Sequence, residues 1–210
     1  MKHISTLILI FIFLFTFENG QAQSRTKTNF GSDWEFRKEG QDTWEKVTLP
    51  HTANIENLVV VKQFQGVSYY QKKFKANPSK DSKVFLYFEG VMSEAEVFIN
   101  NQKAANHKGG YLPFTVDVTP YLNKDSDNLV TLKVTNVDNP EIPPGKAIKD
   151  LDFNFYGGIY RNVYLITTNK LFITDPIHVN KKASGGVFVN FNSVSKNKAE
   201  GIIKVHLKNE

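Results

Sequence analysis

The sequence predicts an all-β protein, built as an antiparallel sandwich or barrel. Many short runs of alternating or β-rich residues follow one another along the 210-residue chain. Turn-forming pairs such as Asn100-Asn101, Gly157-Gly158 and Gly185-Gly186 separate these runs. No long segment repeats its apolar residues with the helical period. The length fits one or two domains.

Residues 1–22 have the pattern of a secretory signal peptide. A short basic start precedes an apolar run of 12 residues, 6–17, and Gly20 and Ala22 are the small residues expected before a cleavage site after Ala22. As a helix the run would extend about 18 Å, which is less than the ~30 Å hydrocarbon core of a bilayer. We therefore expect an exported protein, periplasmic or secreted, with no membrane anchor after cleavage.

Charge and cysteine content exclude several classes of protein. The 26 Lys and Arg residues exceed the 21 Asp and Glu residues by five, but no block of five or more like charges occurs. We therefore expect no nucleic-acid partner. The chain has no cysteine, which excludes a disulfide framework, a thiol nucleophile, an iron–sulfur cluster and a cysteine-ligated zinc site.

The predicted strands follow in chain order. They cover residues 34–37, 67–74, 84–88, 95–100, 114–118, 129–135, 159–167, 173–179, 187–191 and 202–207. A long irregular stretch, residues 136–155, contains three prolines, and a loop of that length in a compact domain is more often functional than idle. Residues 171–210 hold about three strands, fewer than a sandwich of their own requires. Either they pair with the first domain or they begin a second one, and we favour the second interpretation.

Catalytic and metal-binding motifs are absent from the sequence. It has no His-Glu-x-x-His stretch, no Gly-x-Ser-x-Gly elbow and no phosphate-binding or dinucleotide-binding glycine loop. The carboxylates of Asp125 and Asp127 fit a hairpin turn better than a calcium site. Asp150 and Asp152 end the proline-rich loop, and on an extended segment both would point to the same face. Their spacing alone leaves open a pair of glycosidase carboxylates, a solvated loop pair and carboxylates paired with an arginine.

The same loop carries the residues that indicate a family. The stretch KDLDFNFYGGIYRNV at 149–163 resembles the end of the N-terminal sugar-binding domain of glycoside hydrolase family 2, which includes β-galactosidases, β-glucuronidases and β-mannosidases. Six further stretches resemble that domain in the same order: WEKVTLPHT at 44–52, VSYYQKKF at 67–74, FEGV at 88–91, EAEVFIN at 94–100, GGYLPFTVDVT at 109–119 and VTNVDNP at 134–140.

The resemblance implies a domain plan. Residues 23–169 would form a jelly-roll β-sandwich like that of galactose-binding domains, and residues 170–210 would begin an immunoglobulin-like sandwich that is incomplete here. A third domain, a (β/α)8 barrel with the catalytic glutamates, would lie outside this chain, so no catalytic residue is assigned to it. The family hydrolyses O-glycosidic bonds with retention, using two carboxyl groups about 5–5.5 Å apart.

The resemblance also implies site residues and partners. Asp152 matches an aspartate that contacts the sugar in family β-galactosidases and binds a monovalent cation there. Asn54 is a weaker candidate for the rim of the active site, because the family tryptophan before it is Ala53 here. The full-length enzyme would act on a β-linked oligo- or polysaccharide, hold a monovalent or divalent cation and form a homo-oligomer. The alternatives are a separate carbohydrate-binding sandwich without catalytic activity and a structural or interaction domain without a sugar site.

Overall fold

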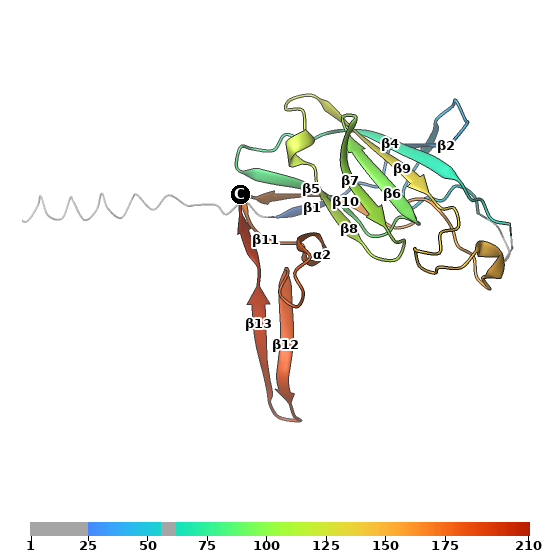
Figure 1. Ribbon diagram of the computed structural model, residues 1–210. Helices are drawn as coiled ribbons and strands as arrows, with labels where there is room; N and C mark the ends of the chain where they lie inside the picture. The colour runs from blue at the N-terminus through green and yellow to red at the C-terminus, as the bar shows by residue number, and fades with distance from the viewer. Residues whose placement is uncertain (1–24, 56–61) are drawn as a thin grey trace, which may run out of the picture.

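The computed structural model describes residues 25–55 and 62–210 and shows two antiparallel sheets that face each other as a β-sandwich (Figure 1). The prediction of an all-β fold is confirmed. The predicted signal segment, residues 1–22, lies outside the described residues. None of the helices in the described part of the chain is long and apolar enough to cross a membrane.

Within the described residues, ten strands build the sandwich. One sheet consists of β2 (Trp34–Lys38), β3 (Glu45–Val47), β4 (Val67–Lys75), β6 (Glu94–Ile99), β7 (Gln102–Lys108) and β9 (Asp127–Thr135), in the spatial order β3-β2-β4-β9-β6-β7. The other consists of β1 (Thr26–Asn29), β5 (Ser82–Phe88), β8 (Phe114–Asp117) and β10 (Val163–Asn169), in the order β1-β10-β5-β8. Two single 3-10 turns, η1 (Thr119–Tyr121) and η2 (Ile148–Asp150), lie in the connections.

The core lies between the two sheets. Successive side chains of a strand point to opposite faces, so the alternating pattern of β9 buries Val130, Leu132 and Val134 and leaves the residues between them facing outward. Trp34 and Tyr70 are fully buried in the same core. The alternation seen in the sequence therefore predicts the inner face of these strands correctly.

A second group of elements follows the sandwich. It consists of β11 (Leu171–Ile173), α2 (Pro176–Val179), β12 (Val187–Val194), β13 (Ala199–Val205) and β14 (Leu207–Asn209), and we call residues 171–210 the tail. β11 pairs with β14, while β12 and β13 form a hairpin that extends away from the sandwich (Figure 1). Most residues of the hairpin are exposed; Phe191 is 61% exposed and Ile203 is 67% exposed. The domain boundary at residue 170 and the immunoglobulin-like interpretation of the tail stay predictions.

The strand predicted over residues 173–179 is wrong. The chain leaves β11 after Ile173 and forms the single turn α2. The Asp175 carboxylate accepts hydrogen bonds from the backbone N–H groups of Ile177 and His178, and Pro176 occupies the start of the helix, where its missing N–H costs nothing. These local signals override the apolar alternation of the segment.

Three strands of the sandwich are absent from the sequence prediction. β1, β3 and β7 have the sequences TKTN, EKV and QKAANHK, which lack an apolar face. All three lie at sheet edges, where a strand has a partner on one side only and polar residues oppose aggregation. The strand predicted over 159–167 also begins later, at Val163, and the one predicted over 202–207 is interrupted at His206.

Candidate functional site

The long loop between β9 and β10, residues 136–162, lies at one end of the sandwich, drawn in gold at the right of Figure 1. It folds over a small apolar cluster that Ile148 and Phe155 of the loop form with Met92 from the segment between β5 and β6, with Leu151 and Tyr160 packed against them. The loop is therefore an ordered structure with a separate core.

The beginning of this loop is bonded to the segment before β4. The buried amide of Asn136 accepts a hydrogen bond from the Gly66 N–H at 2.9 Å and donates one to the Phe64 carbonyl at 2.8 Å. The Asp138 carboxylate accepts from the Gln65 amide at 2.5 Å and from the Ile148 N–H at 3.0 Å. Asn136 and Asp138 each form two hydrogen bonds, and these four bonds hold the start of the loop in one position.

The end of the loop is held by a glycine. Gly158 forms an antiparallel bridge with Met92, with N···O distances of 3.0 and 3.1 Å. Its φ of +103° lies in the region that favours glycine, and a Cβ atom there would come within 2.5 Å of the Tyr70 hydroxyl and 2.8 Å of the His51 carbonyl oxygen. Only glycine fits this position without displacing its neighbours.

His51 and Tyr70 join the end of the loop to the segment after β3. The Tyr70 hydroxyl lies 3.0 Å from His51 Nδ1, and the His51 N–H donates to the Ile159 carbonyl at 2.8 Å. Burial is the main cause that raises the pKa of the Tyr70 hydroxyl and lowers the pKa of the His51 imidazole, so both stay neutral near pH 7. This pair fixes residues 51–54 beside the loop.

A crevice lies where these segments meet. Its lining consists of Thr52, Asn54, Gln63, Phe64, Phe155, Tyr156 and Gly157, and it is narrower than a water molecule. The Phe155 N–H donates to Gln63 Oε1 at 2.7 Å, which fixes the orientation of the Gln63 amide. Within residues 25–55 and 62–210, the buried Nε2 of Gln63 has no hydrogen-bond partner.

The two predicted site residues lie in different surroundings. Asn54 lines the crevice, is exposed, and accepts a hydrogen bond from Lys38 Nζ at 2.7 Å. Asp152 is exposed, is not among the lining residues, and forms no hydrogen bond or ion pair with any other described residue. The structure thus does not bring Asp152 and Asn54 into one pocket, and their roles as sugar contacts stay predictions.

The monovalent cation expected at Asp152 also stays a prediction. The described part of the chain contains no group of three or more His, Asp or Glu side chains placed to hold a metal ion. As a single exposed carboxylate, Asp152 can accept hydrogen bonds from two hydroxyl groups, and such charge-assisted bonds are about twice as strong as neutral ones.

Sequence reasoning missed Gln63, and it treated Tyr70 only as part of a strand motif. Tyr70 sits at an inward position of β4, so a buried hydroxyl in need of a partner is a signal that the alternating pattern contains. Gln63 lies in irregular chain 92 residues from Phe155, and no local pattern reveals that contact.

Comparisons with known proteins place this chain in a family. The model of the glycosyl hydrolases family 2 sugar binding domain matches residues 17–169. A β-galactosidase of Thermoanaerobacter pseudethanolicus is 33% identical over 173 residues, which cover 76% of this chain and 23% of the relative. A β-glucuronidase of Bacteroides fragilis is 35% identical over 183 residues, which cover 85% of this chain and 25% of the relative.

A solved structure shows the same fold. β-Glucuronidase 2 of Bacteroides uniformis is similar with a TM-score of 0.75 and 25% identity, over 89% of this chain and 22% of that one. The chain spans about a quarter of the length of the curated relatives that it matches. With the matching domain model, the identity to these relatives and the shared sandwich, this chain belongs to the glycosyl hydrolases of family 2 and contains their sugar-binding domain.

Proposed function

We propose that this chain is the N-terminal region of an exported glycosidase that hydrolyses β-galactosides or β-glucuronides with retention. The names of the relatives support the two substrate classes, and their greater length supports a catalytic domain outside residues 1–210. The signal pattern of residues 1–22 supports export to the periplasm or the medium. In this proposal the sandwich binds carbohydrate, and its 136–162 loop contributes to the rim of the active site.

One observation supports this role for the loop above the others. Asn136 and Gly158 hold the loop at both ends, whereas the Asp152 carboxylate between them is exposed and unpaired within the described residues. A ligand-binding group is most effective when its backbone is held rigidly before the ligand arrives. A fixed loop with an unpaired carboxylate has this property.

The first experiment tests the size and activity of the whole polypeptide. Antibodies against the peptide 147–161 would isolate the native protein from the source cells, for measurement of intact mass and of hydrolysis of p-nitrophenyl β-D-galactoside and β-D-glucuronide. We expect a mass several times that of the 210-residue chain and hydrolysis of one of the two substrates. A native polypeptide of about this chain's size that binds carbohydrate without hydrolysing it would establish the alternative, a separate binding module.

A substitution tests the assigned residue. In the full-length enzyme, Asp152→Asn keeps the shape of the side chain but removes the charge, and we expect kcat/KM to fall at least about tenfold, or ~1.4 kcal/mol of transition-state stabilisation. Asp150→Asn, two residues earlier and also exposed, is the matched control and should leave kcat/KM within about twofold. Equal values for the Asp152→Asn variant and the unchanged enzyme would show that Asp152 makes no contact with substrate.

A further inference from the structure

The tail meets the sandwich over a contact that is incompletely packed. Its main contacts are those of α2 with β8 and of β11 with β10. The Phe172 ring packs on Phe85 with 5.4 Å between ring centroids, and the His178 ring meets Phe85 edge-on at 6.2 Å. A cavity of about 240 Å³ remains between the outer face of the four-stranded sheet and the tail. Regions of one chain move relative to each other unless the contact between them is large and apolar, so these contacts alone do not fix the tail.

A single residue connects the sandwich to the tail. β10 ends at Asn169 and β11 begins at Leu171, so only Lys170 separates them. The Lys170 N–H donates to the Asp81 carbonyl at 2.9 Å, and the Lys170 carbonyl accepts from the Glu210 N–H at 3.3 Å. Both ends of the tail therefore meet beside Lys170. Because these main-chain bonds lie at one point, they leave open the direction in which the tail extends.

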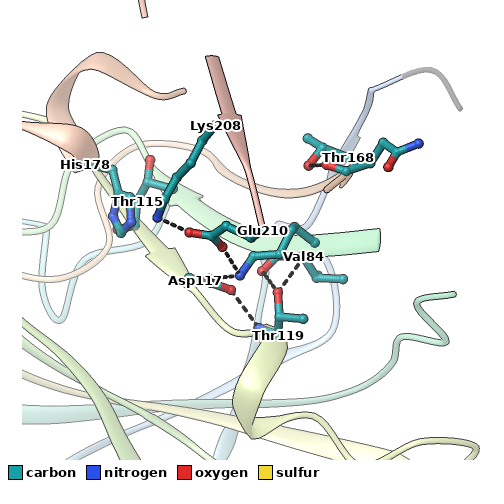
Figure 2. A network of polar contacts seen from close by, with 10 residues as sticks. Val84, Thr115, Asp117, Thr119, Thr168, His178, Lys208 and Glu210 are labelled. Carbon is teal, nitrogen blue, oxygen red and sulfur yellow. Dashed lines mark hydrogen bonds and ion pairs between the residues drawn. The ribbon is translucent and has the colours of Figure 1, made fainter. Parts of the chain in front are cut away.

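A largely buried lysine side chain bridges the two regions next to this connection. Lys83 Nζ, on β5, lies 2.6 Å from the Asp117 carboxylate of β8 and 2.5 Å from the Glu210 carboxylate at the end of the tail (Figure 2). The Asp117 carboxylate also accepts a hydrogen bond from the Thr119 N–H at 3.0 Å, which holds it in place on the sheet. Glu210 pairs in addition with Lys208 of β14. The ion pairs therefore run from two strands of the sheet into the tail.

Burial makes this group of charges stronger than the ion pairs at the surface of the sandwich. The Lys83 side chain is 14% exposed, whereas that of Lys103, which pairs with Glu96 at 2.6 Å on the other sheet, is 51% exposed. Water and salt screen a partly buried pair less than an exposed one. Loss of one partner is costly, because the remaining charge then stays buried without compensation. Charges placed in this way also fix the register of two surfaces, since other orientations leave them unpaired.

We propose that Lys83, Asp117 and Glu210 form an ionic latch that fixes the direction in which the tail extends from the sandwich. Without the Lys83 ammonium, the two carboxylates face each other across the contact and the tail swings about Lys170. In the proposed full-length enzyme, the latch also sets where the following domains lie relative to the 136–162 loop, which makes Lys83 a positioning residue. That consequence rests on the proposed function, whereas the latch rests on the contacts alone.

The test measures the distance between the two regions in the chain of 210 residues. Because the chain has no cysteine, Lys73→Cys on β4 and Lys196→Cys between β12 and β13 provide two exposed sites for nitroxide labels. We expect pulsed electron paramagnetic resonance to give one narrow distance distribution. Lys83→Met keeps the length of the side chain but removes its charge, and should broaden the distribution and shift its mean. An unchanged distribution would overturn the latch.

Two further variants separate the latch from general effects of substitution. Lys103→Met breaks the exposed pair on the other sheet, which does not involve the tail, and should leave the distance distribution unchanged. Glu210→Met leaves the pair between Lys83 and Asp117 within the sandwich and should broaden the distribution as Lys83→Met does. This variant decides the matter if Lys83→Met does not fold. A narrow distribution for Glu210→Met would show that the apolar contacts hold the tail, which contradicts the latch.

Kinetics of the full-length enzyme test the positioning role. Lys83→Met should lower kcat/KM at least about tenfold, because a displacement of about 1 Å far from the reacting atoms can cost a factor of about 100. Lys103→Met should leave kcat/KM unchanged. A broadened distance distribution with unchanged kcat/KM would support the latch and overturn the positioning role. A polypeptide that hydrolyses neither substrate would contradict the proposed function and the positioning role together, and the distance measurement would still decide on the latch.

Discussion

The β9 strand of the sandwich and the β12–β13 hairpin of the tail show how similar sequences reach different environments. Both alternate β-rich apolar residues with polar ones, as in LVTLKVT and VFVNF. In β9 every second side chain is buried between the two sheets, whereas in the hairpin both faces are exposed. The alternating pattern thus predicts a strand and the face that it can bury, but what covers that face depends on the neighbouring elements.

The largest expected effect comes from comparing apolar positions of the two regions. Leu132→Ala removes a fully buried side chain of β9 and should lower the free energy of unfolding by about 3 kcal/mol, the sum of lost burial and the cavity left behind. Ile203→Ala, at a 67% exposed position of β13, should cost less than about 1 kcal/mol. Urea unfolding followed by far-UV circular dichroism registers the strands of both regions. Equal costs for the two variants would contradict the comparison.

An intermediate effect is expected at two glycines within the sandwich region. Gly158→Ala places a methyl group within 2.5 Å of the Tyr70 hydroxyl at a φ of +103°, so both collision and backbone strain oppose it, and we expect a loss of about 2 kcal/mol. Gly40→Ala has a φ of +80° with no atom within 4 Å of the new Cβ, so strain alone should cost about 1 kcal/mol. Thermal melting of both variants measures the difference, and a Gly40→Ala loss as large as that of Gly158→Ala would exclude the collision as the cause.

The smallest effect is a pH dependence that belongs to the sandwich. Burial lowers the pKa of His51 and His107 in the folded chain below the ordinary value of 6.5. As the pH falls below about 6.5, the unfolded chain therefore binds more protons than the folded chain, and stability decreases. We expect the urea concentration at the unfolding midpoint to decrease as the pH is lowered from 7 to 5. The His107→Gln variant should show a shallower fall, and an unchanged pH profile would mean that His107 does not contribute.

Much of the sandwich could be predicted from the sequence, because its inner strands carry an apolar face that the alternation displays. The polar edge strands β1, β3 and β7 could not, since they have few buried side chains and exist through backbone pairing with a neighbour. α2 could not be predicted from alternation, because Asp175 and Pro176 direct the chain locally. The loop at 136–155 was recognisable from its length and prolines.

The candidate site was predictable only where residues match the family stretches. Asp152 and Asn54 were found in this way, and the structure places Asn54 in the crevice and Asp152 on the exposed loop. The contact between Gln63 and Phe155 spans 92 residues and leaves no local pattern. The cavity of about 240 Å³ between the four-stranded sheet and the tail is also outside the reach of sequence reasoning, because residues of three strands and the tail form it together.

By itself the sequence determined the all-β class, the inner faces of the long strands and the family, because each depends on local residue order. Only the tertiary structure decided which faces are covered, which loops are held and where unpaired polar groups remain. Phe85 and Phe191 are both apolar residues of strands, yet Phe85 is 6% exposed beneath the tail and Phe191 is 61% exposed on the hairpin. Burial is a property of the surrounding elements, and those are assembled from residues far apart in the chain.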